Sequence, residues 1–394
     1  MNFNLEKHKA LYVIFLAMLA ATPPLSTDMY LAAIPQLADL WQVEKHLANL
    51  TLVLWFAAFS VFILVAGSLS DKYGRKPILL AGLTLFVSAS FLCAASQNVY
   101  QLIVFRVLQG MGAAAPSAIV MAIIRDRFTG NERQQAIAYV MTIVAVAPMV
   151  APIIGALLLE WFSWRFIFMT QGTMVLLSLL IALSFRETIP ERLTTPLFQL
   201  VTRYRVHFGN REFMFASLGM GILSLPFYGF IAFSPIYYIS IFGLSERMFS
   251  LFFGINALSS MAGAYAATAI TRRIGDKPAI TLSIAGCILA AAGVALLAAQ
   301  HYIFFLLFMA LFSFCIGFSR PVSGALILGL VKTDVGSASS FLIFYQFISG
   351  ALCMAFVTYR WQHPVMVYGL LTLATALLVL LIWKSIEKGI NPIH

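Results

Sequence analysis

The chain has 394 residues, of which 61% are hydrophobic and only 10% are charged. A soluble protein is about 45–50% apolar and about 25% charged, so this chain has too few charged side chains for a surface that faces water. The composition excludes soluble enzymes, nucleic-acid-binding domains and secreted disulfide scaffolds, and it predicts that lipid surrounds most of the protein. The net charge of +10 is therefore interpreted through the positions of the basic residues, and no nucleic-acid partner is expected.

Long, uninterrupted apolar runs predict an all-α membrane protein, because the strands of a membrane barrel alternate apolar and polar residues over about 10 positions. One span needs about 20 residues, and the chain accommodates twelve. The predicted spans are 10–36, 48–70, 77–96, 101–124, 134–159, 165–185, 212–242, 248–271, 278–299, 302–331, 336–358 and 364–383. The basic N-terminus followed by the first run resembles a cleavable signal peptide, but we interpret it as an uncleaved first helix because many similar spans follow.

The longest polar break, 186–211, divides the twelve spans into six and six. We therefore predict an N-terminal six-helix bundle over 1–185, a cytoplasmic connecting loop over 186–211 and a C-terminal bundle over 212–394. Nineteen of the 25 Lys and Arg residues fall in segments on the N-terminal side of the membrane, four fall on the other side and two lie within spans. This bias predicts that both termini are cytoplasmic.

A short motif appears between the second and third spans and again between the eighth and ninth. Asp71–Pro77 and Arg272–Pro278 share glycine, lysine and proline at matching positions 201 residues apart, with the Asp and Arg exchanged. Two six-helix halves with matching tight loops predict pseudo-symmetric bundles and a transporter that rocks about a central site.

The first of these loops also predicts a conformational gate. Gly67 is expected to allow close helix packing, Gly74 to allow a tight turn, and Asp71 to pair with Arg75 as a latch on one conformation. The alternative is a basic loop that only sets membrane topology.

Three stretches resemble motifs of the major facilitator superfamily. Gly67–Pro77 is similar to its signature loop, Arg106–Ala114 to the fourth-helix motif of proton-coupled members, and Ala147–Ala156 to the fifth-helix antiporter motif, here with two Ala-Pro steps. The resemblance implies the major facilitator fold, and it implies gating roles for Pro148, Pro152 and Gly155.

The first helix is similar to the bicyclomycin- and chloramphenicol-resistance branch of drug/proton antiporters, through Ser26–Leu31 followed by Ile34-Pro35. Trp164-Arg165 and Glu187-Thr188 fit that branch as well. The resemblance implies a monomeric, multi-pass exporter of small amphipathic molecules in a bacterial cytoplasmic membrane. It also implies that the proton gradient drives export without a cofactor.

Asp28 is the one acid that the predicted spans enclose, and an intramembrane acid is a functional candidate by default. We predict that Asp28 carries the coupled proton and that Arg106, which keeps its charge, pairs with it. Two alternatives stay open: Asp28 as a permanently paired structural acid, and Arg106 as an anchor that snorkels to the interface.

Arg320, in the tenth span, is the second intramembrane cation. It predicts a substrate site that favours anionic or zwitterionic groups, or, alternatively, a cap on carbonyls freed by Pro321. Other polar and aromatic side chains in spans are further substrate-binding candidates, although each also suits helix packing. They are Tyr30, Trp55, Gln109, Asn256, Tyr237 and Gln346.

Other chemistry is not indicated. The four cysteines lie far apart without metal-ligand or disulfide spacing, and no phosphate-cradling Gly-rich motif for ATP is present. No metal site, catalytic residue or enzyme activity is expected. Two alternatives to drug export remain: a dedicated exporter of an anionic metabolite such as a siderophore-like polycarboxylate, and a channel or membrane sensor.

Overall fold

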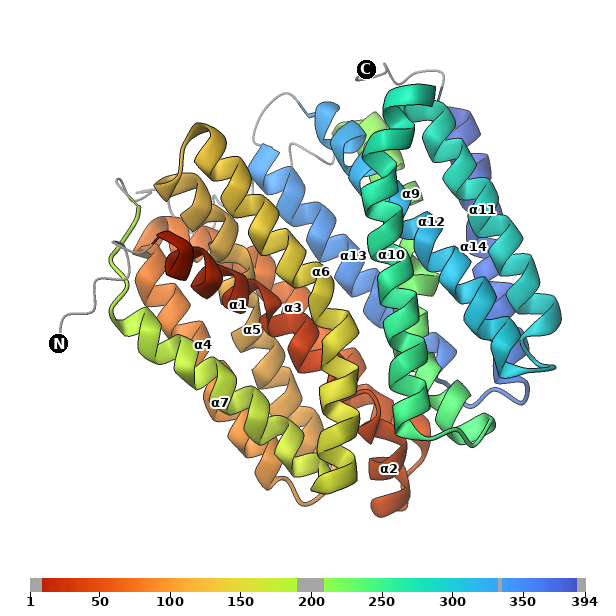
Figure 1. Ribbon diagram of the computed structural model, residues 1–394, viewed down its shortest axis with the longest axis horizontal. Helices are drawn as coiled ribbons and strands as arrows, with labels where there is room; N and C mark the ends of the chain where they lie inside the picture. Colours follow the sequence, from red (N-terminus) through yellow and green to blue (C-terminus); the bar gives the residue numbers. More distant parts are fainter. Residues whose placement is uncertain (1–8, 190–208, 332–334, 388–394) are drawn as a thin grey trace. The chain divides into compact units, whose positions relative to one another are not determined.

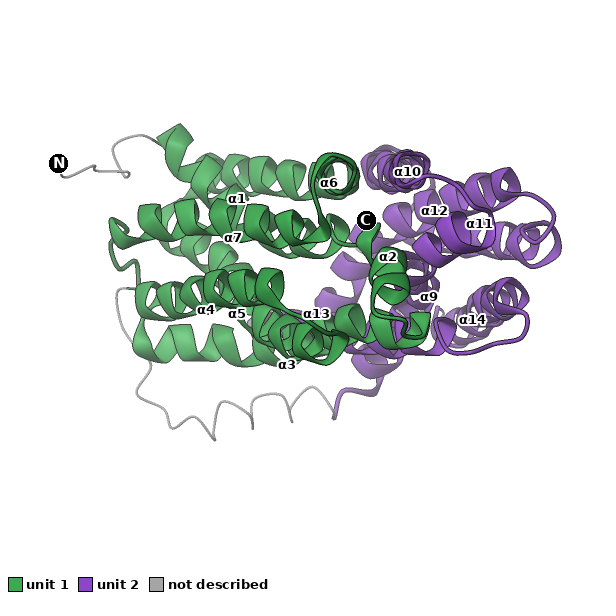
Figure 2. Ribbon diagram, turned by 90° about the horizontal axis from the view of Figure 1, so that it is seen from below, with its two compact units in different colours: residues 1–200 green, residues 201–394 purple. Residues whose placement is uncertain are grey.

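The computed structural model describes residues 9–189, 209–331 and 335–387, and within these ranges all regular structure is helical (Figure 1). Twelve of these helices are long and apolar enough to cross a membrane. The predicted all-α fold with twelve spans is therefore confirmed. The chain clusters into two compact units, residues 1–200 and 201–394 (Figure 2).

The described residues of unit 1 form six spanning helices and one short helix. These are α1 (Lys9–Asp28), the short α2 (Ala33–Leu40), α3 (Lys45–Tyr73), α4 (Arg75–Ala95), α5 (Val99–Arg127), α6 (Gly130–Trp161) and α7 (Trp164–Leu183). Unit 2 also contains six spans, the first of which ends in a π-helical turn. They are α9 (Arg211–Pro235) with η2 (Ile236–Ile241), α10 (Glu246–Ile274), α11 (Asp276–Leu297), α12 (Tyr302–Gly329), α13 (Val335–Val357) and α14 (Pro364–Ile386).

The two units repeat one packing scheme. In unit 1, α5 packs on α3 and α4, α4 packs on α7, and α1 packs on α6; in unit 2, α12 packs on α10 and α11, α11 packs on α14, and α9 packs on α13. The matching loops have matching backbones, since Gly74 and Gly275 both have positive φ, 108° and 83°, between consecutive spans. This pairing confirms two pseudo-symmetric six-helix halves.

The first predicted span, 10–36, is wrong as one continuous helix. The α-helix α1 ends at Asp28 and α2 begins at Ala33. In the turn between them the Tyr30 N–H bonds to the Thr27 carbonyl at 3.2 Å, one residue short of the α-helical register. Pro35, in the first turn of α2, has no N–H to donate to an incoming helix, which is consistent with a new helix start. The break sets Asp28 at a helix end.

Most of the predicted connecting loop lies outside the described residues, at 190–208. So do several basic residues that entered the topology argument: Lys7, Arg192, Arg203, Arg205, Lys332 and Lys388. The cytoplasmic placement of the loop and of both termini stays a prediction.

Candidate functional site

Asp28 is buried at the C-terminal end of α1, with 5% of its surface exposed. Its Oδ1 accepts a hydrogen bond of 2.8 Å from the hydroxyl of Thr27. That hydroxyl is also within reach of the Pro23 and Pro24 carbonyls, and α1 continues through both prolines. The acid therefore occupies the junction between a proline-containing helix and an irregular turn.

The helix break releases the carbonyl of Ser26, because the Tyr30 N–H that would reach it in a continuous α-helix bonds to Thr27 instead. Buried carbonyls need a donor. Two side chains from other helices provide one: Nη1 of Arg106 on α5 at 3.2 Å, and Nε2 of Gln171 on α7 at 3.2 Å. The end of α1 is thus tied to α5 and α7 by polar side chains.

Arg106 is fully buried and lies among aromatic rings. Its guanidinium carbon is 4.9 Å from the ring centroid of Tyr30, 5.5 Å from that of Trp55 and 5.8 Å from that of Phe168. Nη1 also donates to Oε1 of Gln109 at 2.5 Å, and Gln109 donates onward to Gln171. Three predicted residues, Tyr30, Trp55 and Gln109, therefore surround a fourth, Arg106.

The predicted ion pair between Asp28 and Arg106 is wrong in this structure. No salt bridge among the described residues includes either side chain. The guanidinium is instead directed to the Ser26 carbonyl, since the broken helix offers an acceptor there. Arg106 Nη2 and the indole Nε1 of Trp55 are buried without a hydrogen-bond partner.

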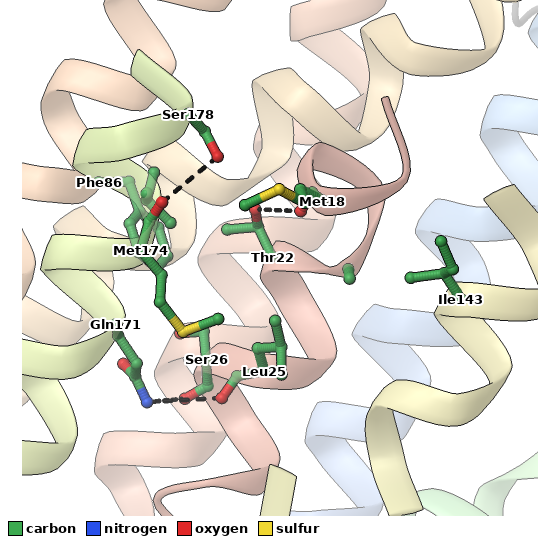
Figure 3. Close-up of a pocket in the computed structure, with 11 residues that line it drawn as sticks. Met18, Thr22, Leu25, Ser26, Phe86, Ile143, Gln171, Met174 and Ser178 are labelled. Carbon is green, nitrogen blue, oxygen red and sulfur yellow. Dashed lines mark hydrogen bonds between the residues drawn. The ribbon is translucent and has the colours of Figure 1, made fainter. Parts of the chain in front are cut away.

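A cavity of about 120 Å³ lies beside this network (Figure 3). Figure 3 shows Gln171 directed at the Leu25 and Ser26 carbonyls, and Met18 of α1 and Met174 of α7 also line the cavity. Its lining is mainly apolar and comes from α1, α4, α6 and α7. Flexible methionine side chains suit ligands of varied shape. Gln171 was missed by the sequence analysis, although its amide within the apolar run of α7 is a visible signal.

The loop between α3 and α4 forms a charged cluster at one end of unit 1. Arg75, 2% exposed, donates to Asp71 at 2.5 Å and to Asp126, at the end of α5, at 3.1 Å. The predicted Asp71–Arg75 contact is present, and its gating role stays a prediction. Asp126 was missed, because sequence spacing does not indicate that the end of α5 meets the start of α4.

Glu187, after α7, caps the N-terminus of α4. Its carboxylate accepts from the backbone N–H of Arg75 at 2.9 Å and of Lys76 at 3.2 Å, and it also accepts from Thr188 and Ile189. Partial burial raises the pKa of this carboxyl, but the four N–H donors outweigh burial and hold its pKa below the usual range. A helix N-terminus favours such an anion.

The predicted gating residues differ in their packing. Gly74 has φ of 108°, as a tight turn requires, and Gly155 on α6 packs so closely on Met29 that an added Cβ would overlap its carbonyl. At Gly67 the expected close packing is wrong, since an added Cβ would meet no atom within 4 Å. Pro148 and Pro152 lie inside an unbroken α6, and their gating roles stay predictions.

In unit 2, Arg320 and Gln346 line one cavity of about 220 Å³ between α9, α12 and α13. Asn256 and Tyr237 lie elsewhere. Asn256 bonds to the Phe252 carbonyl and to Ser313, and the Tyr237 hydroxyl donates to the Ala298 carbonyl at 2.6 Å within an aromatic cluster. The structure gives these two side chains packing contacts, and their substrate contacts stay predictions.

Within residues 9–189, 209–331 and 335–387, no group of three or more His, Cys, Asp or Glu side chains is arranged to hold a metal ion. The four cysteines are free and buried.

Known proteins share this sequence pattern. The family model described as Major Facilitator Superfamily matches residues 15–354. The chain is 31% identical over 355 residues to the uncharacterized MFS-type transporter YdgK of Bacillus subtilis, covering 88% of each chain. It is 31% identical over 369 residues to the multidrug resistance protein MdtL of Shewanella oneidensis, covering 91% of this chain and 88% of MdtL.

Solved structures share the fold. The model superposes on a bacterial homologue of the human lysosomal transporter Spinster with a TM-score of 0.76 at 15% identity, covering 98% of this chain and 99% of that chain. It superposes on a D-xylose-proton symporter with a TM-score of 0.73 at 17% identity, covering 93% and 96%. The family match, the bacterial relatives and the twelve apolar helices indicate a multi-pass protein of the bacterial inner membrane.

Proposed function

The chain belongs to the Major Facilitator Superfamily, whose members are transporters rather than enzymes, and we propose that it is a proton-coupled exporter of small amphipathic molecules. Several bacterial relatives are named as multidrug resistance proteins. That naming, with the mainly apolar cavity beside Arg106, supports cargo of this kind. We propose that the protein works as a monomer, with the proton gradient as its energy source.

The observation that carries the proposal is the position of Asp28. It is buried at the break between α1 and α2, and the Thr27 hydroxyl donates a hydrogen bond to it. An ionised carboxylate without a cation partner is costly in an apolar interior. Taking up a proton neutralises the carboxylate and removes that cost. The charge at the break between α1 and α2 therefore depends on whether Asp28 carries a proton.

The same segment contacts the cavity. Ser26, two residues before Asp28, lines the cavity and is held by Arg106 and Gln171. A change of charge at Asp28 therefore acts on the end of α1, where Arg106 and Gln171 bind the Ser26 carbonyl. Substrate binding and protonation are coupled in this proposal because both act on residues 26–28.

The proposed cycle uses one proton site. Deprotonated Asp28 permits substrate binding from the cytoplasm, and a proton taken up from outside releases the substrate. The protonated carrier then returns and deprotonates inside. Each charge crossing the membrane contributes about 2.3 kcal/mol per 100 mV, and each pH unit about 1.36 kcal/mol per proton. Either term supports at least about a tenfold concentration ratio, which needs about 1.36 kcal/mol.

The test is proton release from purified protein in detergent when amphipathic drugs are added, followed by pH-driven transport in proteoliposomes. Asp28→Asn keeps the shape of the side chain and is expected to abolish both signals while substrate binding remains. Asp39→Asn is the matched control, because Asp39 is an exposed acid of α2. If Asp28→Asn sustains pH-driven transport at the wild-type rate, the assignment of Asp28 is wrong.

A further inference from the structure

Arg320 keeps two unused hydrogen-bond donors inside unit 2. Its Nε and Nη2 are buried and have no hydrogen-bond partner, and no salt bridge among the described residues includes it. Its guanidinium lies over the ring of Phe227, with 4.7 Å from its carbon to the ring centroid, and 5.8 Å from that of Tyr228. The rings hold the charged plane in place and leave one of its edges unoccupied.

That edge has the geometry for an anion. Nε–H and the neighbouring Nη2–H lie side by side on a planar guanidinium, a fork that matches the two oxygens of a carboxylate or two oxygens of a phosphate. An arginine keeps its charge in a protein, and a buried charge without a counter-charge is costly. An anion held by both donors would remove that cost.

The surrounding cavity provides room and no competing negative charge. It has a volume of about 220 Å³, and none of the described residues that line it is an Asp or Glu. Its polar wall includes Ser217, Ser224 and Ser323, whose hydroxyls donate to carbonyls of their own helices. The guanidinium is thus the one positive group on a neutral wall.

The rest of the lining is largely apolar, with Ser319, Tyr345 and Gln346 as further polar members. Met220, Leu223, Ile316 and Leu342 face the same space, so a bare inorganic ion would leave much of the cavity without a partner. A ligand with one anionic group and an apolar body fits both parts of the lining.

We propose that this cavity is an anion subsite that takes the carboxylate or phosphate group of an amphipathic organic anion, through Nε and Nη2 of Arg320. As a substrate subsite it rests on the proposed export function. As an anion-binding site it depends only on the contacts within unit 2.

The test is equilibrium binding to the full-length protein, purified in detergent at pH 8 without phosphate and without a proton gradient. The probes are 2-naphthoate and 2-naphthamide, which share one ring system and differ in charge. A carboxylate accepts both N–H groups through charge-assisted hydrogen bonds, which are stronger than those to a neutral amide, so the wild type is expected to bind the carboxylate about 10- to 100-fold more tightly than the amide. Arg320→Gln is expected to lose that preference.

Arg272→Gln is the matched control, since it removes an exposed arginine from the same unit, and it should bind like the wild type. If Arg320→Gln does not purify as folded protein, Arg320→Lys retains the charge without the fork and should bind 2-naphthoate at least several-fold more weakly. Equal affinity for carboxylate and amide, or unchanged affinity in the Arg320 variants, overturns the proposal.

Competition identifies the source of the anion. Displacement of 2-naphthoate by benzoate supports a substrate subsite, whereas displacement by phosphatidylglycerol alone would assign the site to a lipid headgroup and overturn its role as a substrate subsite. Arg320-dependent binding without proton-driven flux would reject the export function and leave the anion site standing. Proton-driven flux without Arg320-dependent binding would reject the anion site and leave the export function standing.

Discussion

The surroundings of Arg106 and Arg320 differ, although both arginines lie on equivalent helices of the two halves, α5 and α12. Arg106 donates to the Ser26 carbonyl and to Gln109 and lies among three aromatic rings. Arg320 also lies over aromatic rings, but its Nε and Nη2 have no partner. The difference follows from the helices nearby, since α1 breaks beside Arg106 and leaves a carbonyl to be satisfied.

Arg106 and Arg320 therefore have two different uses inside their helical bundles. In unit 1 the guanidinium stabilises an irregular backbone next to a titratable acid, which makes it part of the architecture of the proposed proton site. In unit 2 the guanidinium retains donor capacity for a ligand. Removing one arginine should therefore affect the fold, and removing the other should affect binding.

The largest expected effect is on stability at Arg106. Arg106→Gln leaves Oε1 of Gln109 without its donor, which costs about 1–3 kcal/mol for a buried acceptor, and leaves the Ser26 carbonyl with Gln171 alone. Arg320→Gln removes a hydrogen bond to the Tyr228 side chain and the contacts with two aromatic rings. Thermal unfolding of the two variants in detergent should show the larger loss for Arg106→Gln. Equal losses would contradict the distinction between an architectural and a ligand-binding arginine.

A second effect concerns the turn that Arg106 holds. Gly155→Ala places a methyl group against the carbonyl of Met29, and overpacking of this kind costs about 1–3 kcal/mol. We expect lower thermal stability and a clear loss of transport in proteoliposomes. Gly67→Ala meets no atom within 4 Å, so its thermal stability should match that of the wild type. Wild-type stability in Gly155→Ala would show that the turn adjusts freely.

The smallest effect is at the charged end of unit 1. Because the pKa of Glu187 is lowered in the folded protein, its ionised form stabilises the start of α4 above the usual pKa of a glutamate. That contribution is lost as the pH falls through the lowered value. Glu187→Gln should lower stability near neutral pH by at most about 1 kcal/mol, since the group is partly exposed. The difference from wild type should disappear in acid, as measured by unfolding at a series of pH values. A difference that persists unchanged in acid would contradict the charged cap.

Much of the fold was predictable from local signals. Apolar runs of spanning length identified the helices, and the repeated motif at Gly74 and Gly275 identified the two halves. The positive φ of both glycines shows why that motif needs the residue. The first span was the exception, because Pro35 and the polar residues around Asp28 lie inside an apolar stretch that hydropathy alone treats as one helix.

The candidate site was predictable as a set of residues and not as a set of contacts. Asp28, Arg106 and Arg320 are conspicuous because charges are rare in spans, whereas Gln171, Asp126 and Glu187 become partners only through packing of helices distant in sequence. The expected Asp28–Arg106 pair failed for that reason: opposite charges suggested a contact, and the backbone of α1 provided a different acceptor.

The amino-acid sequence was sufficient to predict that lipid surrounds the protein, that twelve helices cross it and that the two halves repeat one another. It also identified the charged residues within spans as functional candidates, because these features follow from hydropathy and from residue type. Only the tertiary structure decided which charges are satisfied. Arg106 donates through Nη1 because the break in α1 frees a carbonyl beside it, although its Nη2 has no partner. Arg320 leaves both Nε and Nη2 unbonded because the described residues around its cavity present hydroxyl, amide and apolar groups without an acid.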